Sequence, residues 1–431
     1  MPKKFMQPID AIKLSAARAA IPQPEPGLTP EVLVARAADM RALLREAQEE
    51  NDRRGHYSDA IHQKFAAGGF YRVVQPRMFG GYEFDFVTFV RLIMEISRGH
   101  PATAWCYTLA SSHAFLVGAH WPEEAQCELF GAQGDFRAAQ KASPAGTFKR
   151  VDGGFLIDGT FSFCSGIPVA THFIGAGIVP AGNDSVRGIY FIVRRDQLTI
   201  LADWGGEASL GMQGSGSNSV KLTGVFVPDH HIVDSNMLLS SEQFVGGTHG
   251  TRLHQNPMYL SVIGGAYHCE FGAITTGAAR AALDEYEHIL RTRKMPGGQA
   301  LKLNDPESQR AFGQAINLTD SAEALTLAAA QLYMDQCHRW AKDGSPITAR
   351  DTMQVWGIAR EACLMACEAV EMLFQTAGAT VCLPGQRLQR YFRDVQMYRI
   401  HVTAQPQVAT LTAQTHLGMP TAFGSSARTA K

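Results

Sequence analysis

The spacing of apolar residues predicts that the chain begins with helices. Between residues 33 and 47, apolar side chains recur every three or four positions, which places them on one face of an amphipathic helix. Thr29 and Pro30 are N-cap and first-turn residues that favour a helix start at this point. The same spacing predicts helices over 87–96 and 103–117. The N-terminal part, up to about residue 135, is therefore predicted to be mostly helical.

The pattern changes near Gly153, where apolar residues begin to alternate with polar or small ones. Alternation with a period of two is typical of half-buried strands. Short apolar runs follow at 172–179, 188–193 and 220–227, separated by Gly, Asn, Asp and Pro residues that favour turns. This part of the chain is predicted to form an antiparallel barrel or sandwich.

From Tyr259 onward the pattern predicts long helices again. The amphipathic segments run over 259–292, 307–341, 349–377 and 387–415. Four helices of this length predict a helical bundle. Helices followed by strands and then by helices form a segmental order, which argues against a Rossmann domain with its alternating strands and helices.

The composition is that of a globular protein without a charge bias. The chain has 431 residues, of which 45% are apolar and 18% charged. The formal net charge of −1 gives no support to nucleic-acid binding. No apolar run is long enough to span a bilayer, and the N-terminus lacks the apolar core of a secretory signal. A cytoplasmic protein without a membrane partner is therefore expected.

The cysteines do not predict a metal site. The chain has eight of them, at positions 106, 127, 164, 269, 337, 363, 367 and 382. None forms a Cys-x-x-Cys pair, and no His lies at zinc-site spacing beside two of them. Buried free thiols are expected instead.

Several motifs follow one another in the order found in the acyl-CoA dehydrogenase superfamily. They are Gly69-Phe70 with Gly80-Gly81-Tyr82, Pro144-Ala145-Gly146-Thr147, Asp158 to Gly166, Gly211-Met212 with Val225 to Pro228, Gln375 to Ala379, and Arg393-Asp394. The resemblance covers about residues 30 to 418 and implies that superfamily's fold, mainly α with a central β domain. The implied parts are an N-terminal arm over 1–28, a helical domain over 29–137, an antiparallel β-barrel over 138–240 and a four-helix bundle over 241–431.

Within that superfamily the chain resembles the reduced-flavin-dependent monooxygenases, the oxygenase components of two-component aromatic hydroxylases. Ser162-Phe163-Cys164-Ser165-Gly166 is closer to their Ser-Phe-Ser-Ser-Gly than to the dehydrogenases' Trp-Ile-Thr-Asn. Trp105, followed eight residues later by His113, resembles the Trp and His of their substrate pocket. His401 corresponds to their C-terminal catalytic His, in a neighbourhood where the dehydrogenases carry a Glu.

The resemblance implies an enzyme that forms a C4a-hydroperoxyflavin from reduced flavin and O2 and inserts one oxygen atom into a small aromatic substrate, most commonly a phenol. A separate NAD(P)H:flavin reductase would supply the reduced flavin, in agreement with the absence of a nicotinamide-binding motif. The dehydrogenases' Arg-x-x-Phe-Gly appears as Arg293 to Gly297 without the Phe, which favours FMNH2 over FADH2. The scaffold usually assembles as a homotetramer.

The resemblance also implies which residues contact the flavin. Ser165 is the candidate hydroxyl for flavin N5, with Cys164 as the alternative. Phe163 and Trp105 would form a dry wall that keeps water away from the reacting oxygen. Thr147, by its match to the flavin loop, and Gln140 complete the candidate cofactor-binding set.

Two histidines are candidate catalytic residues together with Ser165. His401 would act as a base or stabilise a phenolate, because its ordinary pKa of about 6.5 suits proton transfer near neutrality. The helical pattern places Met397 and Tyr398 on its face. His113 lies among small and apolar residues, so it either lines the pocket or is simply buried.

Two alternatives to the oxygenase remain open from the sequence. One is an acyl-CoA dehydrogenase whose base has moved to the helix beginning near Tyr259, where Glu270 is the carboxylate nearest the expected position. The other is a non-catalytic flavin- or ligand-binding homologue, which the Cys at position 164 permits.

Overall fold

The N-terminal end of the described chain lies against the helical part of the molecule. This computed structural model describes residues 20–182, 185–236, 240–244, 246–295 and 297–419. The predicted arm over 1–28 thus falls outside the described residues as far as residue 19. After that point Gln23 Nε2 donates a hydrogen bond of 2.8 Å to Gly81 O, and Glu25 forms an ion pair with Arg36. None of the helices in the described ranges has the length and apolarity that crossing a membrane requires.

The N-terminal part is helical, as the spacing of its apolar residues predicts. Its helices are α1 (Pro30–Asp39), α2 (Arg41–Glu46), α3 (Gln48–Arg54), α4 (Asp59–Ala67), α5 (Phe86–Gly99), α6 (Pro101–Ser111), α7 (His113–His120) and α8 (Glu123–Phe130). The prediction of one helix over 103–117 is wrong, because Ser112 separates α6 from α7. Ser111 Oγ donates to Tyr107 O at 2.8 Å, and such hydrogen bonds from Ser to the preceding turn bend helices.

The middle of the chain forms two four-stranded sheets. The strands are β1 (Ala138–Lys141), β2 (Thr147–Val151), β3 (Gly154–Phe161), β4 (His172–Gly182), β5 (Ser185–Arg194), β6 (Thr199–Ile200), β7 (Val220–Pro228) and β8 (Ile232–Asp234). One sheet has the order β1-β4-β5-β8 and the other β2-β3-β7-β6. Inward-facing side chains of both sheets, among them Phe161, Phe173 and Phe191, share one apolar core.

The expectation of an antiparallel barrel is wrong in two respects. The described strands do not close into a barrel, since the sheets have separate edges. In addition, β1 pairs with β4 in parallel, with Ala138 opposite His172. The β1 edge lies against α6 and α7, so helices cover it where a closed barrel would add a strand. Alternation along a strand shows which side chains face the core but does not show what covers the strand's edge.

The C-terminal part contains three long helices that contact one another pairwise: α10 (Ile263–Thr292), α11 (Pro306–Asp343) and α12 (Ala349–Thr376). The short helix α9 (His249–His254) precedes them. The fourth long helix, predicted over 387–415, is instead divided into α13 (Arg387–Arg399), a 3-10 turn over Val402–Ala404 and α14 (Gln407–His416). Two extended residues interrupt it: His401 after α13, and Gln405, which the following Pro406 forces out of the helical conformation.

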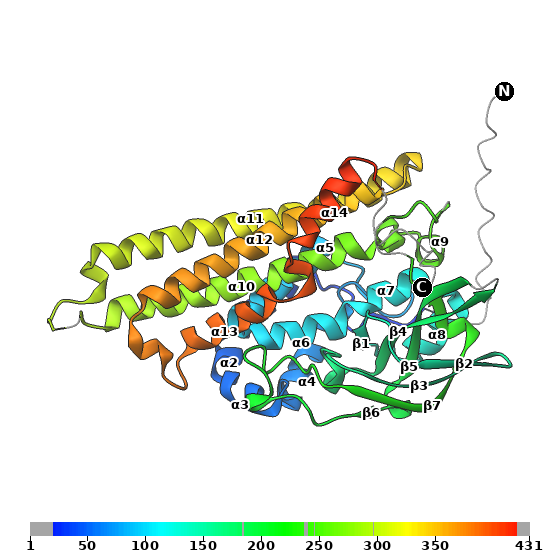
Figure 1. Ribbon diagram of the computed structural model, residues 1–431, viewed down its shortest axis with the longest axis horizontal. Coiled ribbons are helices and arrows are strands. Elements are labelled where there is room, and N and C mark those ends of the chain that lie inside the picture. Colours follow the sequence, from blue (N-terminus) through cyan, green and yellow to red (C-terminus); the bar gives the residue numbers. More distant parts are fainter. Residues whose placement is uncertain (1–19, 183–184, 237–239, 245, 296, 420–431) are drawn as a thin grey trace.

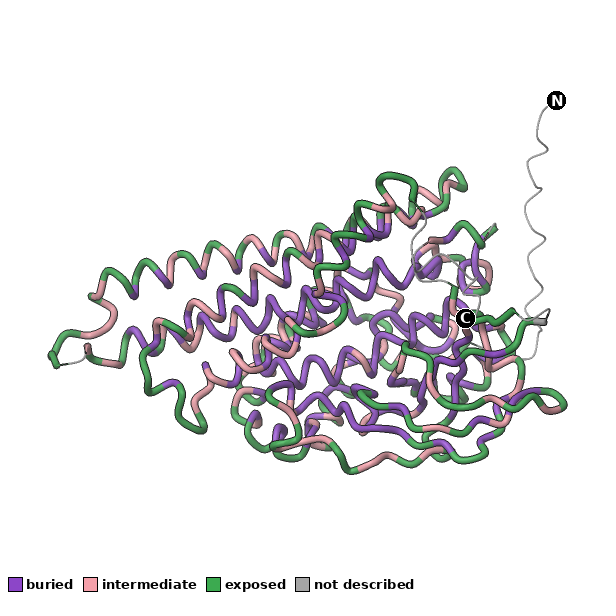
Figure 2. The backbone as a smooth tube through the Cα atoms, in the orientation of Figure 1, coloured by how far each residue is buried: buried purple, intermediate pink, exposed green. Residues whose placement is uncertain are grey.

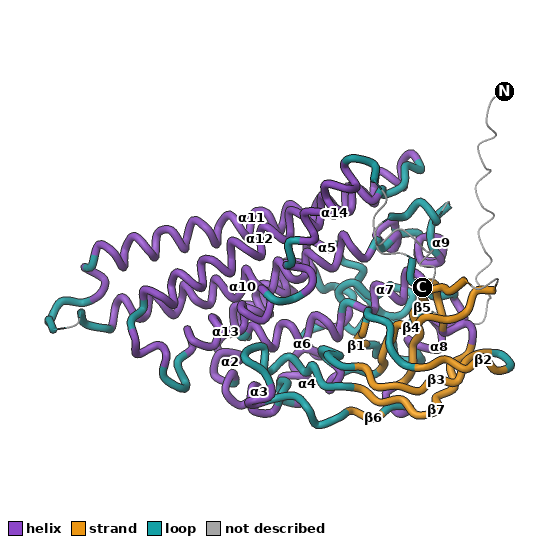
Figure 3. Tube along the Cα trace, viewed as in Figure 1, coloured by secondary structure: helices purple, strands orange, loops and turns teal. Residues whose placement is uncertain are grey.

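Figure 1 shows α10, α11 and α12 side by side, with the strands gathered at one end of the molecule and α6 running next to α10. Helices make up the rest of the chain around this block of strands (Figure 3). Burial is densest along α5, α6 and α10, whereas α11 exposes its outer face (Figure 2). The helical core and the β core are separate apolar clusters. They adjoin each other where α6 meets the sheets.

Candidate active site

An aromatic cluster joins α6, α10 and the segment after α13. The ring centre of Trp105, on α6, lies 5.1 Å from that of Phe271 on α10 and 5.6 Å from that of His401. Phe271 and His401 also contact each other, with ring centres 5.1 Å apart. The fold thus places two sequence-predicted site residues, Trp105 and His401, in contact although 296 positions separate them in the chain.

Ser165 joins this cluster through a chain of hydrogen bonds. Trp105 Nε1 donates to Ser165 Oγ at 3.0 Å. The Ser165 hydroxyl lies 2.7 Å from that of Ser217, which lies 2.7 Å from that of Ser215. The Gly-Ser loop over 214–219 therefore packs against the segment after β3. Ser165, Ser215 and Ser217 are all buried.

Phe163 lies on the open side of the same segment. It is 62% exposed and has a φ of +61°, a left-handed conformation that is rare for a residue with a side chain. Its ring lies edge-on to Trp204 at 5.9 Å, and Lys141 Nζ lies 5.7 Å from the ring centre. An exposed aromatic face, a cation and a nearby Ser hydroxyl suit a flat, anionic ligand, so these residues fit a flavin.

Cys164 and Ser165 point to opposite sides of the chain. The Cys164 thiol donates to Phe161 O at 3.1 Å and belongs to the core of the β sheets, and burial raises its pKa to about 12. Ser165 Oγ instead contacts Trp105. Because the Cys164 thiol is protonated and directed into the core, Ser165 is the side chain of this pair that faces the aromatic cluster.

His113 is buried and held by the backbone. Its Nδ1 lies 2.6 Å from Ala138 O, and a carbonyl can only accept, so Nδ1 carries the proton and Nε2 is left as an acceptor. Burial lowers the pKa of His113, while hydrogen bonds to the backbone and to Gln140 oppose that shift. The imidazole stacks on Tyr267 of α10 with ring centres 5.6 Å apart. Tyr267 thus connects His113 to the helix that carries Phe271.

His401 lies just beyond the end of α13, so the prediction that it belongs to a helix is wrong. It caps the 3-10 turn that follows, and its Nδ1 accepts from the Thr403 N–H at 3.4 Å and lies 2.8 Å from Thr403 Oγ1. A backbone N–H can only donate, so the proton of the neutral ring is on Nε2. Burial, with a smaller contribution from Lys141, lowers the pKa of His401 to about 4. At neutral pH the ring therefore offers an N–H donor.

Of the two remaining predicted flavin contacts, Gln140 lies beside His113 and Thr147 lies apart from the cluster. Gln140 is on β1, and its Nε2 is buried without a hydrogen-bond partner among the described residues. Thr147 begins β2, is exposed and pairs with Asp158 of β3. No contact recorded for the described residues joins Thr147 to Trp105, Ser165 or His401.

Sequence analysis does not identify four residues of this region: Lys141, Trp204, Ser217 and Phe271. Phe271 follows Tyr267 by four positions, a spacing that places both on one helix face and could have drawn attention to them. The other three come from separate loops and strands. Their proximity depends on tertiary packing, for which the local sequence carries no signal.

Comparisons with known proteins agree with the fold. The family model described as "Acyl-CoA dehydrogenase, N-terminal domain" matches residues 34–131, and "Acyl-CoA dehydrogenase, C-terminal domain" matches residues 269–406. Together the two models match more than half of the chain. They leave the β region between them unmatched.

Two curated relatives and one solved structure are similar over most of the chain. The oxygenase subunit HsaA of a flavin-dependent monooxygenase from Rhodococcus jostii is 26% identical over 85% of this chain and 93% of its own. The oxygenase component of p-hydroxyphenylacetate 3-hydroxylase from Acinetobacter baumannii is 24% identical over 77% of this chain and 76% of its own. The structure of XiaF from Streptomyces sp., in complex with FADH2 and glycerol, has a TM-score of 0.81 and 22% identity, covering 91% of this chain and 96% of its own.

Proposed function

The chain belongs to the acyl-CoA dehydrogenase family, and we propose that it is the oxygenase component of a two-component flavin-dependent monooxygenase. In this proposal it uses reduced flavin and O2 to insert one oxygen atom into a small aromatic substrate. The observation that carries the proposal is the meeting of His401, Trp105 and Ser165 around one aromatic cluster. Relatives that are named as oxygenase components and matched along most of their length support it.

The flavin would lie on the open side of the segment after β3. Phe163 offers it an apolar face, Lys141 a positive charge, and Ser165 a hydroxyl already aligned by Trp105 and Ser217. Reduced flavin, when bound, supplies the oxygen-activating chemistry, and the protein supplies orientation and exclusion of water. FMNH2 is the favoured form and FADH2 the alternative, because the Phe of the dehydrogenases' adenylate motif is missing from Arg293 to Gly297.

His401 would act on the substrate as a hydrogen-bond donor. Its Nε2–H would hold a phenol oxygen in place and stabilise the phenolate that attacks an electrophilic oxygen more readily than the phenol does. The low pKa of His401, about 4, keeps the ring neutral until a negative charge forms beside it. Trp105 and Phe271 exclude water around that oxygen, which strengthens the hydrogen bond. His113 Nε2, in contrast, is an acceptor in the same region.

The dehydrogenase alternative requires an ionised carboxylate at Glu270. The Glu270 side chain is fully buried, and burial raises its pKa well above the ordinary value. A protonated carboxyl cannot remove a proton next to a thioester at neutral pH. The environment of Glu270 therefore favours the oxygenase over a dehydrogenase with a displaced base.

A reaction with separate components tests the proposal. Protein, FMN, NADH and an unrelated flavin reductase would be incubated with a panel of phenols under ¹⁸O2, and the products analysed by mass spectrometry. We expect one product that carries a single ¹⁸O atom, formed only when the reductase is present. Oxidation of NADH by the protein alone, or conversion of an acyl-CoA to its enoyl form, would contradict the proposal.

The partners of this enzyme follow from the same proposal. We infer a separate flavin reductase as electron donor and a homotetramer as the assembled form. Native mass spectrometry checks the second inference, with an expected mass of four times the 46.9 kDa chain.

A further inference from the structure

Three polar side chains at the α6–α7 junction and on α10 are buried without hydrogen-bond partners among the described residues. They are the hydroxyl of Ser112, the hydroxyl of Tyr267 and both carboxyl oxygens of Glu270. Ser112 and Glu270 are fully buried and Tyr267 is 8% exposed. Buried polar atoms in native proteins are nearly always paired with protein, water or ligand. Such unpaired atoms concentrated beside a candidate active site indicate a missing hydrogen-bonding partner.

These three residues adjoin one another. Burial raises the pKa of both Tyr267 and Glu270, and the nearby Ser112 hydroxyl opposes that shift in each, although neither pair has the geometry of a full hydrogen bond. Glu270 in turn raises the pKa of Tyr267. Glu270 follows Tyr267 by three positions on α10, a spacing that brings side chains together on one side of a helix. The cluster is therefore one polar group of atoms, to which we refer as the Glu270 cluster.

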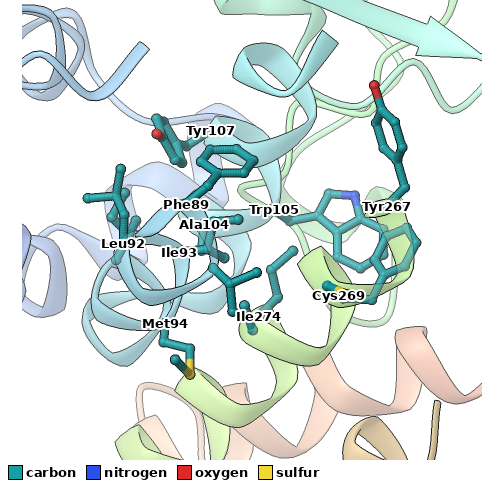
Figure 4. Close-up of a cluster of buried hydrophobic side chains, with 14 of the residues drawn as sticks. Phe89, Leu92, Ile93, Met94, Ala104, Trp105, Tyr107, Tyr267, Cys269 and Ile274 are labelled. Atoms are coloured by element: carbon teal, nitrogen blue, oxygen red, sulfur yellow. The ribbon is translucent and has the colours of Figure 1, made fainter. Parts of the chain in front are cut away.

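Tyr267 of the Glu270 cluster and His401 lie at the two ends of one aromatic wall. Tyr267 stacks on His113, and Phe271, one helical turn further along α10, contacts His401. One turn of a helix rises about 5.4 Å. Figure 4 shows Trp105 and Tyr267 in the buried cluster between α6 and α10, with the Tyr267 hydroxyl pointing away from the apolar side chains. An aromatic ring held at the wall would present one substituent to each end.

The charge of the Glu270 cluster limits which substituent it accepts. Its hydroxyls and protonated carboxyl can both donate and accept hydrogen bonds. The charged groups that influence Glu270 or Tyr267 include no cation. A substrate carboxylate would therefore be buried without a counter-ion, which is costly, whereas a neutral hydroxyl would satisfy the unpaired atoms.

We propose that Ser112, Tyr267 and Glu270 form a subsite that binds a second, uncharged hydroxyl group of the aromatic substrate, at the Tyr267 end of the aromatic wall. The inference rests on the proposed function for the identity of the reaction. The subsite itself concerns binding alone. It makes the substrate a phenol that carries a further hydroxyl rather than a carboxylate.

The test measures binding without turnover. Under anaerobic conditions, with and without reduced FMN, phenols that carry a hydroxyl, a methyl or a carboxylate at the meta or para position would be titrated into the protein by calorimetry. We expect the hydroxyl compound of one series to bind at least about tenfold more tightly than its methyl and carboxylate counterparts, as one or two buried hydrogen bonds allow. Equal binding of the hydroxyl and methyl compounds, or preference for the carboxylate, would overturn the subsite.

Substitutions connect that preference to the named atoms. Tyr267→Phe and Glu270→Leu should reduce the preference to about twofold or less, whereas Glu270→Gln, which keeps a neutral hydrogen-bonding group, should retain most of it. Tyr286→Phe is the matched control, because Tyr286 is also buried on α10 but its hydroxyl pairs with Thr376 Oγ1 at 2.9 Å. An unchanged preference in Tyr267→Phe and Glu270→Leu would mean that the cluster is only structural. Because no oxygen is transferred in these titrations, the subsite and the proposed oxygenation can fail independently.

Discussion

Ser165 is the residue whose surroundings differ most from those of an ordinary turn serine. Its hydroxyl is fixed by the Trp105 N–H and by Ser217, so it is oriented before any ligand binds. Preorganised donors of this kind contribute to catalysis because no reorganisation is needed when charge develops. The same role cannot be filled by the Cys164 thiol, which is directed into the β core.

Replacing Ser165 should therefore separate flavin oxidation from substrate oxygenation. In Ser165→Ala we expect the fraction of reduced flavin that yields oxygenated product to fall about tenfold or more, with hydrogen peroxide released instead. Product and peroxide would be quantified in the same reaction. Ser345→Ala, at a partly exposed loop position, is the control and should match the unaltered protein. Unchanged coupling in Ser165→Ala would show that this hydroxyl does not contact the reacting centre.

The buried environment of His401 predicts how stability depends on pH. Its pKa in the folded protein is about 4, whereas an unfolded His titrates near 6.5. Between these values the unfolded chain binds more protons, so this residue lowers the free energy of unfolding as the pH drops from about 6.5 to about 4. His401→Gln should remove that contribution, which is at most about 3 kcal/mol.

Urea unfolding at pH 7.5 and pH 4.5 measures this effect. We expect the difference in unfolding free energy between the two pH values to be smaller in His401→Gln than in the unaltered protein. His288→Gln, at an exposed position of α10, should leave the difference unchanged. An identical pH dependence in the His401 variant would mean that the ring is more hydrated in solution than its buried position implies.

Sequence motifs identify Trp105, Ser165 and His401 but not the contacts that bring them together. Each contact joins segments far apart in the chain, such as α6 and the turn after α13. Tyr267 and Phe271 are ordinary aromatic positions of an amphipathic helix until α6 and His401 pack against them. Local patterns contain no information on these neighbours, so the aromatic wall emerges only from the fold.

Helix α13 is anchored by a buried ion pair that also fixes the position of His401. Arg390 Nε donates to Asp52 Oδ2 of α3 at 2.7 Å, and both side chains are 9% exposed. One turn later, Asp394 Oδ1 accepts from the Met212 N–H at 2.6 Å. The helix is thus tied to the N-terminal helices and to the loop after β6. His401 lies just after the last turn of α13, so the contacts that hold α13 also determine where His401 lies.

Breaking the ion pair should destabilise the protein and weaken the site. Arg390→Leu removes the guanidinium partner of the buried Asp52, which keeps only His100 Nε2 at 3.2 Å from its other oxygen, and we expect a loss of about 3 kcal/mol in the free energy of unfolding. Arg310→Leu is the control: its pair with Glu307 is exposed and should contribute less than about 1 kcal/mol. Denaturant unfolding of both variants checks the comparison. Equal effects would indicate that Arg390 does not anchor α13.

The elements themselves were predictable where one physical signal dominates. Long amphipathic periodicity predicts α10, α11 and α12 because each buries one continuous face against its neighbours. The break at Ser112 and the extended residue before Pro406 depend on single residues within otherwise helical patterns. Closure of the strands into a barrel depends on edge pairing, which alternation along β1 does not reveal.

The molecule brings its two apolar cores together at the candidate site. Cys164 and Ile167 belong to the β core, whereas Trp105 and Phe271 belong to the helical core. Ser165 lies between them and links the segment after β3 to α6. Such a junction gives a flavin one polar edge and one dry face, as the proposed oxygenase requires.

The most direct test of that oxygenase is the timing of flavin oxidation. Protein with reduced FMN would be mixed with oxygenated buffer, and O2 consumption would be followed together with the absorbance of oxidised flavin. For an oxygenase we expect that O2 is consumed quickly and that oxidised flavin returns only after a delay of seconds. Oxidised flavin that appears as fast as O2 disappears, as with free flavin, would contradict it.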